Sequence, residues 1–205
     1  MGVRTALFRS LASQLGRPRG LYGRLVARML NKGNRDAITA AVDALAPTPT
    51  DTVADLGFGG GLGLGLLIER AGLVHGIDYS PSMVERAARR FHSGKLRLHT
   101  GSMTALPLAD AELDGLITLN TIYFIEDVAL AFTEMTRVLR PGGRAVIGLM
   151  DPAAMAGLPV VEHGFRVRPV AEVIDTLAGA GLDLVDHREI GRHGGAYHLL
   201  VVQRA

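Results

Sequence analysis

Glycine is concentrated in one short stretch of the chain, where residues 57–65 read GFGGGLGLG and six of the nine positions are glycine. A backbone without side chains can approach a bound molecule closely, and glycine also tolerates the positive φ angles of tight turns. A turn of this kind that follows a strand and opens a helix is typical of sites for nucleotide-like molecules. The stretch therefore predicts a ligand-binding turn, and its spacing decides between ligands.

The spacing of these glycines excludes two common phosphate sites. The dinucleotide fingerprint G-x-G-x-x-G would place its third glycine at Leu62, Leu64 or Leu66, depending on the register. The Walker loop requires Gly-Lys followed by Ser or Thr, and no such run follows the glycines. The pattern that fits is acid-x-G-x-G-x-G from Asp55 to Gly61, and its carboxylate argues against a phosphate ligand.

The glycine turn needs a strand before it and a helix after it, and the chain supplies a regular succession of both. Seven short apolar runs read as strands, at 52–56, 73–78, 96–100, 113–120, 144–150, 182–190 and 196–203. Helical patterns lie between them: one from Ser80 as N-cap and Pro81 to about Phe91, one over 127–139 ended by Pro141-Gly142-Gly143, and one over 169–180. Gly63 and Gly65 are expected to let the first helix pack tightly. The alternation predicts a doubly wound α/β fold with a mainly parallel sheet.

Residues 1–46 carry no strand pattern and predict an N-terminal helical cover. Its helices are expected over 3–15, 21–31 and 35–45, the last with Asn34 as N-cap. The run PTPT at 47–50 reads as the hinge into one compact sheet domain over 47–205. Eight basic residues and no acidic one precede Asp36, which indicates either solvated helix faces or an arm for anionic lipid or nucleic acid. We favour the solvated faces.

Composition narrows the class of protein further. The 205 residues suffice for one domain with a full core, and the net charge is only +2. With no cysteine there is no disulfide, no thiolate nucleophile and no cysteine-ligated zinc. The sequence contains no run of eighteen apolar residues, so no membrane-spanning helix is predicted. The N-terminus lacks the continuous apolar region of a secretory signal. We therefore expect a cytoplasmic protein.

Five segments, in this order and spacing, resemble the class I S-adenosylmethionine-dependent methyltransferases over residues 50–150. The motif from Asp55 to Gly61 matches the first motif of the family. Asp78, in GIDYSPSMVERA and twenty-one residues beyond Gly57, matches the acidic residue for the ribose hydroxyls. The segments TGSMTALPLADAELD, DGLITLNTIYFIED and EMTRVLRPGGRAVIG match the regions around the third, fourth and fifth strands. The resemblance implies a Rossmann-like, seven-stranded, mostly parallel sheet that binds S-adenosylmethionine.

The resemblance also implies roles for the residues around this donor, which carries a methionine end, a sulfonium, a ribose and an adenine but no phosphate. Asp55 would supply negative charge near the ammonium, and Asp78 can accept hydrogen bonds from both ribose hydroxyls. The turn would approach the methionine end and the ribose through Gly57, Phe58, Gly59 and Gly61.

On the adenine side, Met83 and Met103 are expected to sandwich the ring by dispersion contacts. Ser102 stands where many relatives carry an acid at the adenine amino group, and its hydroxyl can accept that hydrogen bond more weakly. Asn120 is expected to help hold the methionine end. The remaining residues expected in the donor site are Tyr79, Gly101 and Thr121.

The acceptor is expected where the fourth strand ends, in Asn120-Thr121-Ile122-Tyr123-Phe124. Amino-methylating nucleic-acid enzymes of this class carry Asn/Asp-Pro-Pro-Tyr/Phe there, and the missing prolines argue against a nucleic-acid acceptor. Tyr123 is the candidate for a residue that faces the acceptor, as hydrogen-bond donor or ring wall, or else packs under a lid. Candidate proton acceptors are His163, His193 and His198, whereas His75 and His99 lie within strands and are expected to be structural.

These patterns predict a methyltransferase with a small acceptor, and no metal site is predicted. The apolar residues of segment 151–165 argue for a lipophilic acceptor: Met155, Leu158, Val160 and Phe165. Because methyl transfer from a sulfonium is an in-line displacement, positioning can supply much of the rate without a strong base. Two alternatives stay open, a non-catalytic donor-binding regulator and an enzyme that the basic N-terminus directs to nucleic acid or to a membrane surface. A monomer or a homodimer fits equally.

Overall fold

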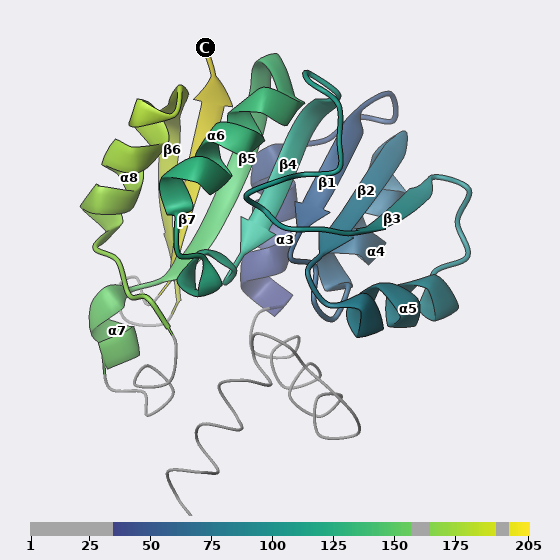
Figure 1. Ribbon diagram of the computed structural model, residues 1–205, viewed down its shortest axis with the longest axis horizontal. Coiled ribbons are helices and arrows are strands. Elements are labelled where there is room, and N and C mark those ends of the chain that lie inside the picture. The colour runs from purple at the N-terminus through teal and green to yellow at the C-terminus, as the bar shows by residue number, and fades with distance from the viewer. Residues whose placement is uncertain (1–34, 157–164, 192–196) are drawn as a thin grey trace, which may run out of the picture.

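The computed structural model describes residues 35–156, 165–191 and 197–205. Its centre is a seven-stranded sheet of order β3-β2-β1-β4-β5-β7-β6, in which β7 runs opposite to the other six strands (Figure 1). The strands are β1 Thr52–Leu56, β2 Leu73–Asp78, β3 Leu96–Thr100, β4 Leu113–Leu119, β5 Leu139–Met150, β6 Leu182–Ile190 and β7 Tyr197–Arg204. This confirms the doubly wound, mostly parallel sheet that the strand–helix alternation predicts.

Helices cover both faces of this sheet (Figure 1). On one face lie α3, α4 and α5, which span Arg35–Leu45, Leu62–Arg70 and Pro81–Arg90. On the other lie α6 and α8, which span Val128–Val138 and Val170–Gly179. The 3₁₀ turn η1, Ile122–Phe124, follows β4, and the short α7, Pro152–Ala156, follows β5.

The core is divided into two layers because successive strand residues point to opposite faces. In β4, Leu116 packs in the layer beneath α6 and α8, whereas its neighbour Ile117 packs beneath α3 and α4. Strands buried on both faces read as continuous apolar runs, which explains why their bounds could be read from the sequence. The layer beneath α3 and α4 also contains Ala41, Val42 and Leu45 of α3, so this helix shares the core of the sheet domain.

The strand order reverses at β1, which has β2 on one side and β4 on the other. In open parallel sheets the crevice at such a switch point, outside the carboxyl ends of the strands, is where ligands bind. The segments that leave β1, β2 and β4 at this edge are the glycine turn, Asp78 with Tyr79, and Asn120 with Thr121. The fold therefore brings the predicted donor residues to one edge of the sheet.

Two local predictions need correction. The strand β5 begins at Leu139, before Pro141-Gly142-Gly143, because Leu139 already pairs with Leu113 ahead of a register shift; α6 thus ends at Val138, before the proline. Ser80 is the N-cap residue of α5, but its side chain makes no capping hydrogen bond and instead meets the Ser82 hydroxyl at 3.0 Å. Its carbonyl accepts from Met83 N–H.

The cover predicted over 1–46 is described only in its last helix, which has the predicted bounds 35–45. The helices expected over 3–15 and 21–31, and the cap Asn34, lie outside the described residues. Among the helices of the described ranges, none combines the length and the apolar character that a membrane crossing requires.

Candidate functional site

The glycine turn adopts backbone angles that side chains resist. Gly57, Gly59 and Gly61 have φ values of 72°, 48° and 74°, in the left-handed region. A Cβ atom on Gly57 would lie 2.6 Å from the Thr121 Oγ1 atom, so the turn and the end of β4 approach too closely for any side chain. Gly61 is the N-cap of α4 and donates its N–H to the Phe58 carbonyl at 2.8 Å. These glycines are required by the shape of the turn.

The neighbouring glycines of α4 differ from each other. A Cβ on Gly63 would lie 2.3 Å from the Asp55 Oδ2 atom, which confirms that this glycine lets the helix approach β1. A Cβ on Gly65 would make only an ordinary contact, 3.6 Å from the Phe91 ring. Close packing therefore accounts for Gly63 and not for Gly65.

Asp78 ends β2 and connects it to the glycine turn. Its Oδ2 atom accepts the N–H of Gly59 at 2.9 Å, and its Oδ1 atom accepts the N–H of Ser80 at 2.9 Å. Burial raises the pKa of this half-buried carboxyl, whereas the two N–H donors lower it. Each carboxylate oxygen can accept more than one hydrogen bond, so Asp78 can hold the turn and still accept from a ligand.

Asp55 lies on the strand before the turn and is buried. Its carboxyl faces the first turn of α4, where the Leu64 N–H donates to it. Burial and, to a smaller extent, the Asp78 charge raise the pKa of Asp55 from 3.8 to about 8. Near neutral pH this carboxyl is therefore largely protonated in the ligand-free protein.

The end of β4 contributes a second strained position. Asn120 has a φ of 58°, an angle that asparagine tolerates better than most residues, and its N–H donates to the Gly148 carbonyl at 2.9 Å. Thr121 follows it and donates its hydroxyl to the Leu119 carbonyl at 3.1 Å. The structure thus places Thr121 against Gly57 of the glycine turn, whereas the roles of Asn120 and Thr121 at the donor stay predictions.

The segment after β3 lies against the same edge. Gly101 donates its N–H to the Asp78 carbonyl at 3.1 Å. The Ser102 hydroxyl meets the Thr104 hydroxyl at 2.8 Å, within a bridge to Ala105. Tyr79, directly after Asp78, has more than half of its surface exposed. Ser102 therefore has a local partner, while Tyr79 stands at the rim of the edge.

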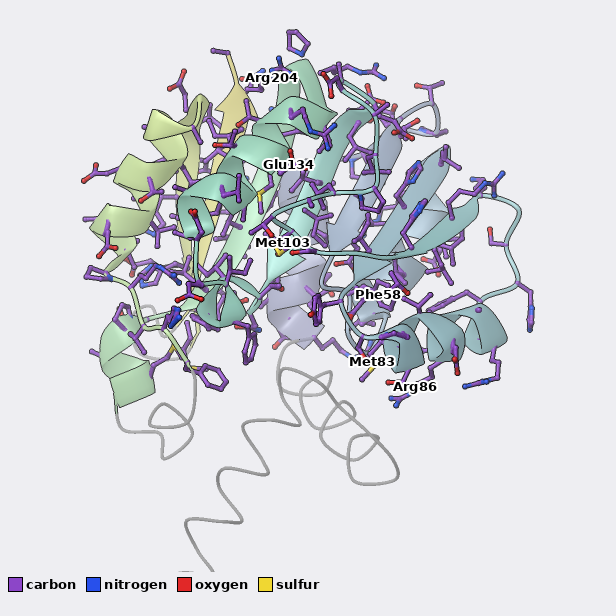
Figure 2. The ribbon with its side chains drawn as sticks, in the orientation of Figure 1. Phe58, Met83, Arg86, Met103, Glu134 and Arg204 are labelled. Atoms are coloured by element: carbon purple, nitrogen blue, oxygen red, sulfur yellow. The ribbon has the colours of Figure 1, made fainter. Side chains whose placement is uncertain are left out.

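The two methionines expected around an adenine are both almost fully buried, at 1% exposure for Met83 and 6% for Met103. Met83 belongs to the core layer beneath α3 and α4, and Met103 to the layer beneath α6 and α8. Figure 2 shows them well apart, Met83 on α5 and Met103 near the middle of the sheet. Core packing accounts for both side chains, and the sandwich stays a prediction.

Tyr123 lies in η1 and is packed rather than open. Its hydroxyl accepts the N–H of Met150 at the end of β5, and burial raises the pKa of Tyr123 to about 12. Its ring centroid lies 5.8 Å from that of Phe165, which in turn lies 4.7 Å from Phe124. The hydroxyl can donate a proton in a hydrogen bond, but it is not a base at neutral pH.

Of the histidines that the sequence analysis singled out, three are described by the structure and two are not. His163 and His193 lie outside the described residues. His198 pairs with Leu149, near the carboxyl end of β5, and its Nε2 atom lies 3.1 Å from the Asp151 Oδ2 atom. His75 and His99 hydrogen-bond to each other in β2 and β3 at 3.1 Å, which agrees with a structural role. Sequence reasoning missed Asp151, because no motif surrounds it.

Comparison with known proteins gives a consistent result. Residues 54–147 match the model of the methyltransferase domain family. An uncharacterised methyltransferase of Bacillus subtilis is 30% identical over 147 residues, which cover 71% of this chain and 78% of that protein. An uncharacterised 37.1 kDa protein encoded in a transposon of Streptomyces fradiae is 40% identical over 114 residues, 54% of this chain. The chain spans only 33% of the length of that second relative.

A solved structure extends the likeness to nearly the whole chain. It is the methyltransferase in a complex with the Trm112 methyltransferase activator of Haloferax volcanii, with a TM-score of 0.76 and 23% identity. The superposition covers 96% of each chain. At this identity the likeness concerns the fold, and it agrees with the seven-stranded sheet described above.

Proposed function

This chain belongs to the class I S-adenosylmethionine-dependent methyltransferases, and from that premise we propose that it methylates a small, lipophilic molecule at the edge formed by the glycine turn, Asp78 and Tyr123. The donor carries its own activation in the sulfonium. The chain therefore has to bind and orient the donor and the acceptor and to exclude water. The observation that carries the proposal is the bridge from Asp78 to the Gly59 N–H. It places a carboxylate with spare acceptor sites directly on a backbone cradle.

The residues present fit this donor. The turn from Gly57 to Gly61 offers backbone without side chains, and a Cβ on Gly57 would collide with Thr121. Asp78 would hold the ribose hydroxyls through the lone pairs that Gly59 and Ser80 leave unused. Asp55 would face the ammonium. The roles of Met83, Met103 and Ser102 at the adenine are part of the same proposal.

The burial of Asp55 leads to a pH-dependent donor affinity. Its pKa of about 8 means that the carboxyl is mostly protonated at neutral pH without donor. A nearby ammonium favours the ionised form and lowers this pKa, so binding releases a proton. Affinity should therefore fall as the pH falls below 8, by up to about tenfold per pH unit. Calorimetry with the demethylated donor product, in two buffers of different ionisation enthalpy, would measure the released proton.

Asp55→Asn is the matched control, since it keeps the shape and the acceptor for Leu64 N–H but cannot ionise. It should bind more weakly near neutral pH and without proton release. An unchanged proton release in this variant would refute the role of Asp55. The variant should also stabilise the donor-free protein near pH 8: the folded pKa lies above the ordinary 3.8, so the wild type loses stability as the pH rises from 3.8 to 8.

The proposed acceptor side rests on apolar and aromatic groups. Tyr123, Phe124 and Phe165 form a ring cluster beside the end of β4, and Phe124 is 39% exposed. Met155 is 2% exposed and packs in the core, so core packing accounts for it, and its place beside the acceptor stays a prediction. The remaining residues of that argument, Leu158 and Val160, lie outside the described residues.

Tyr123→Phe separates the ring from the hydroxyl. The variant loses the acceptor for the Met150 N–H, which should cost about 1–2 kcal/mol of unfolding free energy. We expect turnover to fall by about tenfold while donor affinity stays within twofold, because the hydroxyl serves the acceptor side. Thermal unfolding measures the loss of stability, and donor titration measures the donor affinity. A variant with full turnover would exclude the hydroxyl from the acceptor site.

The acceptor itself can be found by incubating the enzyme with methyl-labelled S-adenosylmethionine and a metabolite extract. We expect label in small molecules that partition into organic solvent. Label in the nucleic-acid or protein fraction would contradict the small acceptor. Donor binding without any label transfer would instead support the regulatory alternative.

A further inference from the structure

Three potential metal ligands lie together on the outermost strand β6 and its neighbour β7, away from the glycine turn. They are His187 and Glu189 of β6 and His198 of β7, and one ligand atom from each lies within 4.8 Å of the others. The His187 Nε2 and His198 Nδ1 atoms are 3.0 Å apart. Two imidazole nitrogens bound to one tetrahedral zinc ion lie roughly 3.3 Å apart, given Zn–N distances of about 2.0–2.1 Å. The spacing of the pair is thus close to that of a bound pair.

The strand register produces this cluster. Glu189 pairs directly with His198 across the antiparallel ladder, and His187 is two residues before Glu189. Residues two apart on a strand share a face, and directly paired residues point to the same side. Within the part of β6 and β7 that the structure describes, all three side chains therefore project from one face.

A fourth residue, Asp151, contacts one member of the group from the other side of its ring. The Asp151 Oδ2 atom lies 3.1 Å from the His198 Nε2 atom, opposite the nitrogen that faces His187. Asp151 is itself held by the N–H groups of Ala153 and Ala154. A carboxylate on the far nitrogen of a histidine is the usual support of a metal-binding imidazole, because it fixes the tautomer and the ring.

A second histidine pair in the protein lacks this arrangement. His75 Nδ1 lies 3.1 Å from His99 Nε2, but the nearest carboxylate, Glu112, lies 3.5 Å from the other nitrogen of His75. The third group is therefore on the wrong side of the ring for one ion to meet all three. The His75–His99 pair therefore serves as a comparison within the same protein. Its two nitrogens are about as close as those of His187 and His198, but no third ligand faces the same point.

We propose that His187, Glu189 and His198 bind one divalent transition-metal ion of the zinc type, with Asp151 orienting His198. Imidazole and carboxylate ligands suit Zn²⁺ and Co²⁺, and three protein ligands leave a position for water. The ion would join the edge strand β6 to β7 next to the end of β5. This site was not predicted from the sequence.

The test uses the full chain without an affinity tag, freed of metal with a chelator and then titrated with Zn²⁺ against a chromophoric competitor. We expect one saturable site per chain, and Co²⁺ should give the visible absorption of a low-coordinate ion. His187→Ala should lower the affinity by more than about 100-fold, and Asp151→Asn by about 10–100-fold. Zn²⁺ should raise the melting temperature of the wild type and not of His187→Ala.

His99→Ala is the matched control, because it removes one histidine of the comparison pair and should leave Zn²⁺ affinity unchanged. His187 is exposed, so its variant keeps the test valid even if the buried His198→Ala fails to fold. Wild-type affinity in His187→Ala, or no saturable site in the wild type, would overturn the proposal. None of these readouts depends on methyl transfer, so they are separate from the tests of the proposed function.

Discussion

Asp78→Ala is expected to weaken binding of S-adenosylmethionine and of its demethylated product by about 10²–10⁴-fold. The carboxylate would accept two ribose hydroxyls, and hydrogen bonds to a charged group contribute about 1.5–3 kcal/mol each. The same substitution removes the partners of the Gly59 and Ser80 N–H groups, so the cradle itself loses its support. Calorimetric titration of both ligands measures the loss.

The control for Asp78 is another carboxylate that accepts a backbone N–H, far from the glycine turn. Asp114 is half-buried and accepts the Thr52 N–H at 2.7 Å, at the opposite edge of the sheet. Asp114→Ala should lower stability by a comparable amount while donor affinity stays within twofold. If Asp78→Ala binds the donor like the wild type, Asp78 does not contact the ribose.

Gly57→Ala is expected to lower the free energy of unfolding by about 2–5 kcal/mol and to weaken donor binding as well. The φ of 72° costs alanine about 1–2 kcal/mol, and the new Cβ would meet Thr121 Oγ1 at 2.6 Å, an overlap of the kind that costs about 1–3 kcal/mol. Denaturant unfolding of the donor-free protein measures the sum.

A double-mutant cycle separates the two causes. Adding Thr121→Ala removes the hydroxyl and methyl that the new Cβ meets and leaves the Thr121 Cβ at 3.2 Å, so it should recover most of the steric part and leave the backbone strain. Gly94→Ala is the control, because nothing lies within 4 Å of its Cβ position, and it should change stability by less than about 0.5 kcal/mol. Equal effects of Gly57→Ala and Gly94→Ala would contradict the proposed cause.

The sheet could be predicted because its central strands, such as β1, β2 and β4, are buried and read as apolar runs, and because turn residues bound the edge strands β3 and β6. The bounds of β1, β2, β3 and β6 coincide with the predicted ones, since apolar runs of this length end where turn residues begin. The start of β5 could not be predicted. Its first residues contain Pro141-Gly142-Gly143, and contacts distant in sequence hold them in the strand: Leu139 pairs with Leu113, and the Gln203 side chain donates to the Gly142 carbonyl.

The candidate donor residues could be placed at one edge from motifs, whereas their side-chain environments could not. The raised pKa of Asp55 depends on its burial against α4, which no local pattern reveals. The packing of Tyr123 depends on the Met150 N–H, which belongs to another strand. The group of His187, Glu189 and His198 depends on the register of β6 and β7, and a shift of one residue would disperse it.

The most direct test of the central claim is a crystal structure of this protein with the demethylated donor product bound. We expect the ribose hydroxyls within hydrogen-bond distance of the Asp78 carboxylate. The methionine end should lie against the backbone of Gly57–Gly61, with its ammonium on the side of Asp55. A product molecule bound away from this edge, or bound there with Asp78 still contacting only Gly59 and Ser80, would contradict the account.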